Sequence, residues 1–147
     1  MVFVGLQASG KTTFFLRHFQ ATHAHVSKDL FPNARNRDRR QAREIDAALA
    51  AFKSVVVDNT NATRESRIAP IEAARRHGAR VIGYVFESSV DACRARNEKR
   101  AGKTRVPLVA IYATAKKLEP PAPDEGFDEL HHVRIVDDGF VVLPFVP

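Results

Sequence analysis

Short hydrophobic runs are spaced along the chain, and several of them are continuous rather than alternating with polar residues. Continuous runs bounded by glycine or turn residues are typical of strands buried on both faces of a sheet. The last two runs flank Asp137-Asp138-Gly139, so the chain is expected to end in a hairpin. The predicted strands cover residues 2–4, 24–27, 54–58, 81–86, 132–136 and 140–143.

Between these runs the apolar residues recur with helical spacing, and turn residues separate the segments. Gly78 stands where a helix would end in a left-handed residue, and Ser88 or Ser89 could cap the helix that follows the fourth strand. Residues 101–106 are charged and interrupted by glycine, which predicts a mobile loop. The predicted helices cover residues 11–19, 38–52, 62–77, 89–100 and 107–118.

Two of these helices have an apolar face that predicts how they pack. In the helix over residues 62–77, Ile68, Ile71 and Ala74 are expected to point inward. In the last helix Pro107 suits the first position, and the apolar residues that follow share one face. These residues are Leu108, Ile111, Tyr112, Ala115 and Leu118.

The alternation of strands and helices predicts an α/β fold with a mainly parallel sheet and helices on both faces. The 147 residues, of which 44% are hydrophobic, suit one domain over residues 1–147. In such sheets ligands bind at the carboxyl ends of the strands. The loop after Val4, the segment after Ser27 and the end of the third strand at Asp58 are therefore the predicted site.

The composition narrows the functional classes. The single cysteine, Cys93, excludes an intramolecular disulfide framework and offers no partner for a cysteine-based metal site. The apolar start runs directly into a glycine loop, unlike a secretion signal, and no stretch approaches the roughly 20 apolar residues of a membrane span. A cytoplasmic protein without membrane contact is expected.

The segment Gly5-Leu6-Gln7-Ala8-Ser9-Gly10-Lys11-Thr12 has the spacing Gly-x4-Gly-Lys-Thr between a predicted strand and a predicted helix. In this arrangement backbone N–H groups surround phosphate oxygens, and the start of the helix adds positive potential. Lys11 is expected to reach the β and γ phosphates of ATP or another nucleoside triphosphate, and the Thr12 hydroxyl to bind Mg²⁺. Thr13 and, from a later helix, Arg96 complete the predicted nucleotide contacts. A structural glycine turn is the alternative.

Two acids stand at the predicted ends of strands. Asp58 follows three consecutive valines, where an acid can hold Mg²⁺ directly or through water and lie beside the substrate, while a turn cap is the alternative. Asp29 could accept the proton of an attacking hydroxyl, although a surface aspartate near a turn is common. Asn61 suits a capping role and is also a candidate substrate contact.

Two clusters of basic residues contribute to a net charge of +6 and a pI of about 9.9. The cluster near Asp29 could neutralise the phosphates of a polynucleotide or form an exposed helix start. The later cluster could be a solvated helix face or a lid that brings an arginine over the transferring phosphoryl group. The first cluster is Arg35, Arg37, Arg39, Arg40 and Arg43, and the second is Arg94, Arg96, Lys99, Arg100, Lys103 and Arg105.

Four segments together resemble the polynucleotide 5′-kinase branch of P-loop kinases, a branch that includes small stand-alone bacterial proteins. The resemblance covers nearly the whole chain, and its most specific element is the Asp-Asn-Thr-Asn run, which is similar to the kinase domains of animal polynucleotide kinase-phosphatases. The segments are the glycine loop, Ser27-Lys28-Asp29, Val57-Asp58-Asn59-Thr60-Asn61, and Arg96-Asn97-Glu98-Lys99-Arg100 with Pro107.

This resemblance implies a P-loop kinase fold with a helical lid, ATP and Mg²⁺ as cofactors, and DNA or RNA 5′ ends as partners. By position, Lys11 and Thr12 match the nucleotide-binding pair, and Asp29 matches the general base for the 5′-hydroxyl. Asp58 matches the acid of the family's second strand motif, and Arg100 matches the arginine of the lid.

Three positions depart from the family pattern. Lys28 stands where arginine is usual, and Ala62 stands where proline is common. The chain has Pro32 near the place of an arginine that holds a substrate phosphate, so the choice of substrate is open.

The leading hypothesis is transfer of the ATP γ phosphate to the 5′-hydroxyl of DNA or RNA. A kinase for a nucleoside, sugar or antibiotic hydroxyl would use the same Lys11, Thr12 and Asp29 without needing the arginines of residues 35–43. A regulatory P-loop ATPase, which transfers phosphate only to water, is the third hypothesis. The sequence leaves the choice of nucleotide and the oligomeric state open.

Overall fold

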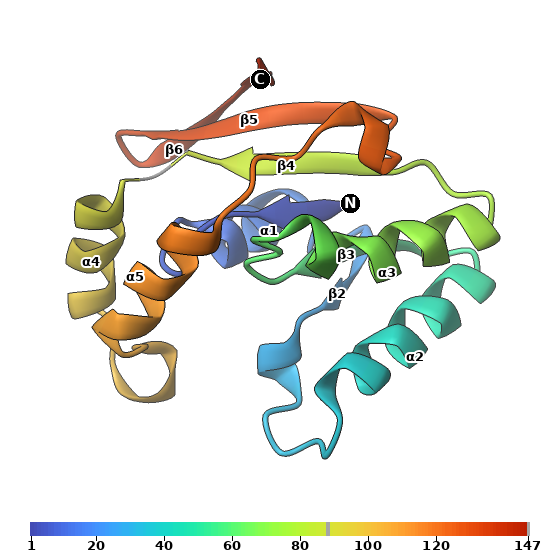
Figure 1. Cartoon of the computed structure of the whole chain (residues 1–147), viewed down its shortest axis with the longest axis horizontal. Coiled ribbons are helices and arrows are strands. Elements are labelled where there is room, and N and C mark those ends of the chain that lie inside the picture. The colour runs from blue at the N-terminus through green and yellow to red at the C-terminus, as the bar shows by residue number, and fades with distance from the viewer. Residues whose placement is uncertain (88, 147) are drawn as a thin grey trace.

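Six strands form one sheet in the order β2-β3-β1-β4-β5-β6 in the computed structural model, which describes residues 1–87 and 89–146 (Figure 1). Strands β1 to β5 run parallel, and β6 returns antiparallel to β5 as a hairpin. The predicted mainly parallel sheet and its final hairpin are therefore confirmed. The strands are β1 (Val2–Val4), β2 (His23–Val26), β3 (Ser54–Asp58), β4 (Ile82–Phe86), β5 (Glu129–Val136) and β6 (Gly139–Pro144).

Helices connect the parallel strands, and the short 3₁₀ turns η1 to η3 lie in the loops. The Ser89 hydroxyl caps α4 by accepting a hydrogen bond from the Ala92 N–H, whereas the other predicted cap, Ser88, lies outside the described residues. Gly78 has a φ of 67°, which confirms the left-handed residue predicted after α3. The described helices are α1 (Lys11–His18), α2 (Arg37–Ala50), α3 (Arg64–Arg76), α4 (Val90–Glu98) and α5 (Leu108–Lys117), with η1 (Lys28–Leu30), η2 (Gly102–Thr104) and η3 (Pro123–Glu125).

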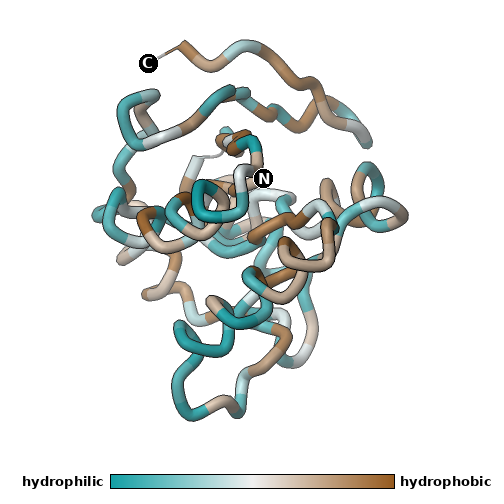
Figure 2. The backbone as a smooth tube through the Cα atoms, turned by 90° about the vertical axis from the view of Figure 1, so that its right-hand side faces the viewer, coloured by the Kyte–Doolittle hydropathy of each residue, from teal (hydrophilic) through white to brown (hydrophobic). Residues whose placement is uncertain are grey.

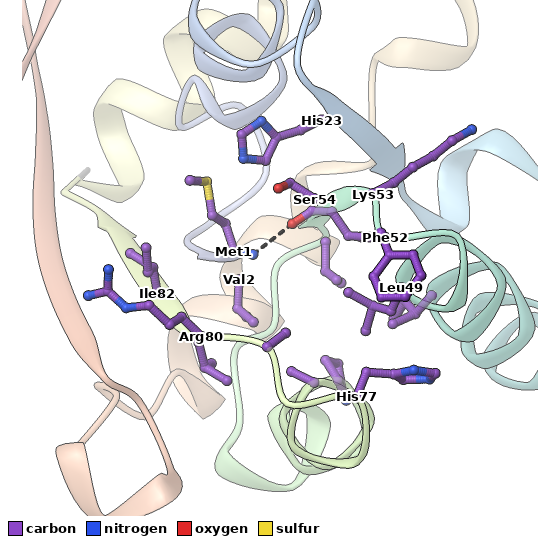
Figure 3. Close-up of a pocket in the computed structure, with 17 residues that line it drawn as sticks. Met1, Val2, His23, Leu49, Phe52, Lys53, Ser54, His77, Arg80 and Ile82 are labelled. Carbon is purple, nitrogen blue, oxygen red and sulfur yellow. Dashed lines mark hydrogen bonds between the residues drawn. The ribbon is translucent and has the colours of Figure 1, made fainter.

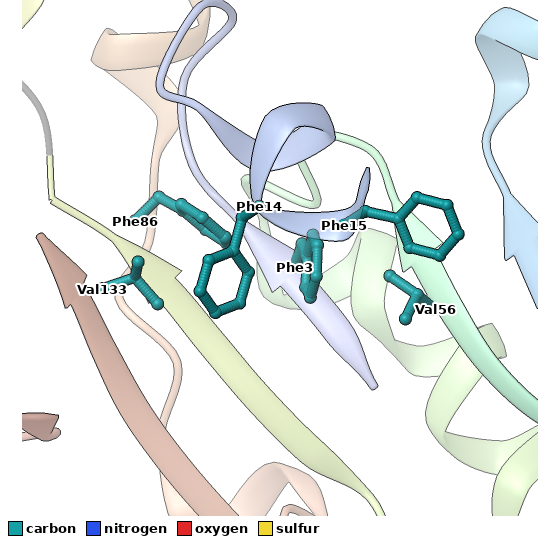
Figure 4. Packing of buried hydrophobic residues seen from close by; sticks show 6 residues of the cluster. All are labelled: Phe3, Phe14, Phe15, Val56, Phe86 and Val133. Carbon is teal, nitrogen blue, oxygen red and sulfur yellow. The ribbon is translucent and has the colours of Figure 1, made fainter. Parts of the chain in front are cut away.

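The side chains of β1 alternate between the two faces of the sheet, and helices cover both faces. Val2 and Val4 point to one face, where they cluster with Ile71 of α3. Phe3 points to the α1 face and is completely buried, which stabilises the fold by about 1.5–3 kcal/mol. The cluster on this face consists of Phe3, Phe14, Phe15, Val56, Phe86 and Val133 (Figure 4).

The predicted inward faces of two helices were partly wrong. Ile68 of α3 is 49% exposed, because the inward stripe of this helix is occupied by Arg67, Pro70 and Ile71. The spacing of apolar residues did not predict this orientation of α3, because an arginine is rarely buried without a partner. Leu108 and Tyr112 of α5 are also exposed, because this helix buries only a narrow stripe at Ile111 and Thr114. Pro107 precedes the first helical residue of α5 by one position.

Polar residues dominate the segment that runs from η1 into α2, at the bottom of the view in Figure 2, whereas β1 and β6 are mainly hydrophobic. The loop between α4 and α5 extends in the same direction as this segment (Figure 1). The first of these segments carries the basic cluster of residues 35–43. The loop carries four members of the second cluster, at residues 99–105, while Arg94 and Arg96 lie in α4. Within residues 1–87 and 89–146, every helix is too short or too polar to cross a membrane.

Candidate active site

The glycine loop lies between β1 and α1, at the carboxyl ends of the parallel strands. Gly10 has a φ of 94°, and an added Cβ would lie 3.1 Å from the side chains of Ile135 and Phe140, so only glycine fits this position. Ala8 is also left-handed, with a φ of 62°, although it carries a side chain. No described side chain caps the start of α1, so its first N–H groups are free to bind an anion.

Lys11 is buried behind this loop. Its ammonium group donates hydrogen bonds to the carbonyl oxygens of Gly5 and Leu6, at 3.0 Å and 2.6 Å, and lies 3.4 Å from the Ser9 hydroxyl. Burial lowers the pKa of Lys11 from 10.5 to about 8, although the nearby carboxylate of Asp58 acts in the opposite direction. A buried cation without a carboxylate partner in direct contact is well suited to receive phosphate oxygens.

Three side chains from different elements meet at the end of β3. The Thr12 hydroxyl donates a hydrogen bond of 2.8 Å to Oδ2 of Asp58, which is only 3% exposed. Nε2 of His25, on β2, lies 2.9 Å from the same oxygen. The His25 ring stacks on Phe15 of α1, with ring centroids 4.0 Å apart. The structure thus brings the two predicted Mg²⁺ ligands together and adds a histidine for which the sequence predicts no part in the site.

The Thr12 and Asp58 oxygens fit a magnesium ion, because Mg²⁺ prefers hard oxygen ligands and usually takes only one or two from the protein. Among the described residues, no group of three or more His, Cys, Asp or Glu side chains is placed to hold a metal. A Mg²⁺ ion at this site would therefore take its remaining ligands from nucleotide phosphates and water.

Asn61 lies deeper than a substrate contact requires. It is 4% exposed and left-handed, with a φ of 44°. Its amide donates hydrogen bonds to the carbonyl oxygens of Phe3 and Val57, at 2.7 Å and 3.3 Å, and thereby joins the ends of β1 and β3. Its own backbone carbonyl oxygen accepts a hydrogen bond from the buried Arg67. The cap of α3 is Thr63, so the expected capping role of Asn61 was wrong. The buried amide of Asn61 joins the strand ends and does not face a substrate.

Asp29 lies in η1, directly after β2, with its side chain 93% exposed. The Ser27 hydroxyl accepts a hydrogen bond from the Asp29 N–H and so shapes this turn. Nη2 of Arg37, at the start of α2, lies 3.6 Å from Oδ1 of Asp29, and Lys28 forms an ion pair with Asp38. The arginine patch, which comprises Arg35, Arg37, Arg39, Arg40 and Arg43, therefore adjoins Asp29, and all five residues are exposed.

The predicted lid segment, residues 94–107, lies on the other side of the glycine loop. Arg96 donates a hydrogen bond of 3.2 Å to the carbonyl oxygen of Ala8, so α4 contacts the loop directly. Arg100 donates to the carbonyl oxygen of Thr104, at 3.2 Å, and its charge contributes to the lowered pKa of Lys11. Gln7 joins the loop to α5 through a 2.9 Å hydrogen bond from its amide to the Thr114 hydroxyl.

Asn97, which is 1% exposed at the end of α4, has a structural role that the sequence alone does not assign. Its amide nitrogen donates to the carbonyl oxygen of Val106 at 2.8 Å, and its amide oxygen accepts from the Val106 N–H at 2.9 Å. These two bonds close the base of the lid segment. The only signal in the sequence is the position of Asn97 between Arg96 and Arg100.

A pocket of about 400 Å³ lies at the N-terminal ends of the strands, opposite the glycine loop, and the ends of α2 and α3 also line it. Figure 3 shows Phe52 and Leu49 on one side of it and Arg80 and Ile82 on the other. The pocket contains none of the predicted site residues. The predicted site therefore lies at the other end of the strands, away from this cavity.

Residues 1–121 match the AAA domain family. The chain belongs to this family. The AAA-domain chain is 28% identical over 140 residues to the bifunctional polynucleotide phosphatase/kinase of Schizosaccharomyces pombe; the match covers 90% of the chain and 33% of that relative. The chain thus spans about a third of the length of this curated relative.

Solved structures show the same fold as this AAA-domain protein. A fungal RNA kinase superposes with a TM-score of 0.66 at 20% identity, with 94% of this chain and 76% of the other covered. A sugar kinase from Janibacter sp. HTCC2649 gives the same TM-score and identity, with 91% and 82% covered. The fold is that of the P-loop kinases, and these structures contain kinases of quite different acceptors.

Proposed function

We propose that this protein transfers the γ phosphate of ATP to the 5′-hydroxyl group of DNA or RNA, with Mg²⁺ bound beside the glycine loop. The observation that carries the proposal is the open position of Asp29. Its carboxylate is 93% exposed and adjoins the arginine patch. A base in this position can meet the end of a long polyanion whose other phosphates lie along the arginines.

The glycine loop and Lys11 supply the nucleotide end of the proposed reaction. The Lys11 ammonium, now bonded to carbonyl oxygens of the loop, would turn to the β and γ phosphates. Thr12 and Asp58 would hold Mg²⁺, which neutralises charge on the phosphates and orients them. Arg96 would lie near the phosphates, because it already contacts the loop at Ala8.

In the proposed transfer, the oxygen of the acceptor hydroxyl forms a bond to the γ phosphorus. The bond between this phosphorus and the β–γ bridging oxygen breaks, and ADP leaves with the electron pair. The hydroxyl proton passes to the carboxylate of Asp29. Lys11 and Arg100 stabilise the negative charge that develops on the transferring group and on the leaving oxygen.

Two comparisons support a nucleic-acid acceptor. The curated relative is a polynucleotide phosphatase/kinase, and one of the structural neighbours is an RNA kinase. The sugar kinase with the same fold makes a small hydroxyl compound the second candidate acceptor. Small-molecule sites enclose most of their ligand, and the exposure of Asp29 therefore favours the polymer.

Transfer of label from γ-labelled ATP to 5′-hydroxyl oligonucleotides tests the proposal. We expect label at the 5′ end of DNA or RNA, and we expect Asp29→Asn to abolish transfer while nucleotide binding is kept. Asp46→Asn is the control, because Asp46 pairs with Arg76 at the far end of α2. Absence of transfer to every DNA and RNA substrate would reject the proposed function, and full activity of Asp29→Asn would remove Asp29 from the mechanism.

A further inference from the structure

We propose that Asn59 is a positioning residue that holds Asp29 in place through hydrogen bonds at both ends of its side-chain amide. Asn59 follows Asp58 in the turn after β3. Its Oδ1 accepts a hydrogen bond of 2.9 Å from the backbone N–H of Lys28, the residue before Asp29. Its Nδ2 donates a hydrogen bond of 2.6 Å to Oε1 of Gln41 on α2. This inference rests on the proposed role of Asp29 as the base.

The segment that carries Asp29 needs such a link because the sheet no longer holds it. The parallel pairing of β2 with β3 ends at Val26 and Val57. Beyond this point η1 is a single 3₁₀ turn, with local bonds to the carbonyl and hydroxyl oxygens of Ser27. The hydrogen bond from Lys28 to Asn59 therefore continues the connection between the two strands after their ladder has ended.

Gln41 gives this link a fixed anchor. It is only 7% exposed and faces inward from the second turn of α2, the helix that carries every arginine of the patch except Arg35. The Asn59 amide therefore joins three parts of the site: the turn after β3, the segment with Asp29, and α2. The predicted metal ligand Asp58 and the positioning residue Asn59 are therefore consecutive residues at the end of β3.

The expected consequence is a defect in turnover without a defect in nucleotide binding. Misplacement of a catalytic group by about 1 Å can cost about 100-fold in rate. The contacts of Lys11 and of the glycine loop do not involve Asn59. We therefore expect Asn59→Ala to lower kcat for transfer by about 10-fold to 100-fold and to leave KM for ATP unchanged.

Variants at Gln41 separate this positioning role from a general loss of packing. Gln41→Glu keeps an oxygen that accepts from Asn59 Nδ2, so kcat should stay near the wild-type value, whereas Gln41→Leu removes the acceptor and should lower kcat. Thr63→Ala is the matched control. It removes the side-chain oxygen of the capping box of α3, destabilises that helix, and should not change kcat.

The experiment measures kcat and KM for ATP with a 5′-hydroxyl oligonucleotide, and hydrogen exchange at the backbone amides. In Asn59→Ala the Lys28 amide should exchange faster than in the wild type, while the amides of α1 should not change. A folded Asn59→Ala protein with kcat within twofold of the wild type would overturn the inference. If the wild type transfers no phosphate, the proposed function fails, and unchanged exchange at Lys28 would overturn the positioning role separately.

Discussion

At the scale of single residues, the buried Lys11 links nucleotide binding to pH. Burial lowers its pKa to about 8 in the nucleotide-free protein, and the negative triphosphate should raise this pKa on binding. Binding therefore favours the protonated lysine, which predominates below pH 8 and is lost above it. We predict that the Kd for ATP is constant below pH 8 and rises above it, by at most about tenfold per pH unit.

Titration calorimetry between pH 7 and pH 9.5 measures this dependence. Lys11→Arg is the control, because a guanidinium stays protonated over this range, so its Kd should not rise above pH 8 whatever its absolute value. A wild-type Kd that is equal at pH 7 and pH 9.5 would contradict the burial of an ionisable Lys11.

A second residue-scale prediction concerns the buried ion pair of Arg67 and Glu125. The guanidinium is fully buried and contacts both carboxylate oxygens, at 2.8 Å and 3.1 Å. Arg67→Ala would leave the Glu125 carboxylate buried without its partner, so we expect a loss of about 3–5 kcal/mol in the free energy of unfolding. Urea denaturation measures this loss.

The neighbouring Arg64 offers the matched control. It pairs with Asp124 at 3.0 Å, but both side chains are largely exposed. Solvent and salt screen such a pair, so Arg64→Ala should leave the urea midpoint almost unchanged. Equal destabilisation by the two substitutions would contradict the role of burial.

The sequence predicts some of these residues and misses others for a physical reason. Lys11 and Thr12 are set by their spacing in one continuous segment, and Asp58 by its place at the end of a strand. Arg67 lies 58 positions before its partner Glu125, so no local pattern reveals that an arginine can be buried there. His25 likewise acquires its contact with Asp58 only when β2 and β3 pair.

At the scale of elements, the backbone just after α2 is strained, and a single substitution should relieve the strain. Phe52 has a φ of 58° and is 99% exposed, in a position where many helices have glycine. Phe52→Gly should remove this strain and raise the free energy of unfolding by about 0.5–1 kcal/mol. Phe52→Ala keeps a Cβ atom and is the control. Chemical denaturation that finds the glycine variant less stable than the alanine variant would contradict this account.

The type of each secondary-structure element could be predicted better than the side on which a helix is buried. The strands and the helices appear where the runs and spacings indicated, because the period of the apolar residues reflects local geometry. Which side of a helix is buried depends on its partners. Ile68 fits the apolar stripe of α3 as well as Ile71 does, yet only Ile71 contacts the sheet, because the buried Arg67 sets the rotation of the helix.

At the scale of the whole molecule, the charge distribution separates a polymer acceptor from a small one. The net charge is +6, and the arginine patch adjoins Asp29. Replacing Arg35, Arg39 and Arg43 with glutamate should weaken oligonucleotide binding. It should also reduce the slope of log K against log salt by about 0.7–0.9 for each phosphate that the patch no longer neutralises. KM for ATP should not change, since these residues do not contact the glycine loop.

A control with the same change in net charge distinguishes the patch from general electrostatics. Lys53 follows the C-terminal end of α2, and Lys116 and Lys117 lie in the last turn of α5. Their replacement by glutamate should change the salt slope much less. Binding titrations at several salt concentrations give the slopes, and equal slopes for the two triple variants would show that the patch is not the binding surface.

Transfer in a mixture of acceptors tests the central proposal most directly. The protein is incubated with γ-labelled ATP, Mg²⁺, a 5′-hydroxyl oligonucleotide, a nucleoside and a sugar, and the products are separated by size. The account predicts that the label appears on the 5′ end of the oligonucleotide and is absent from it when Asp29→Asn replaces the wild type. Label found on the nucleoside or the sugar, or only as inorganic phosphate, would contradict it.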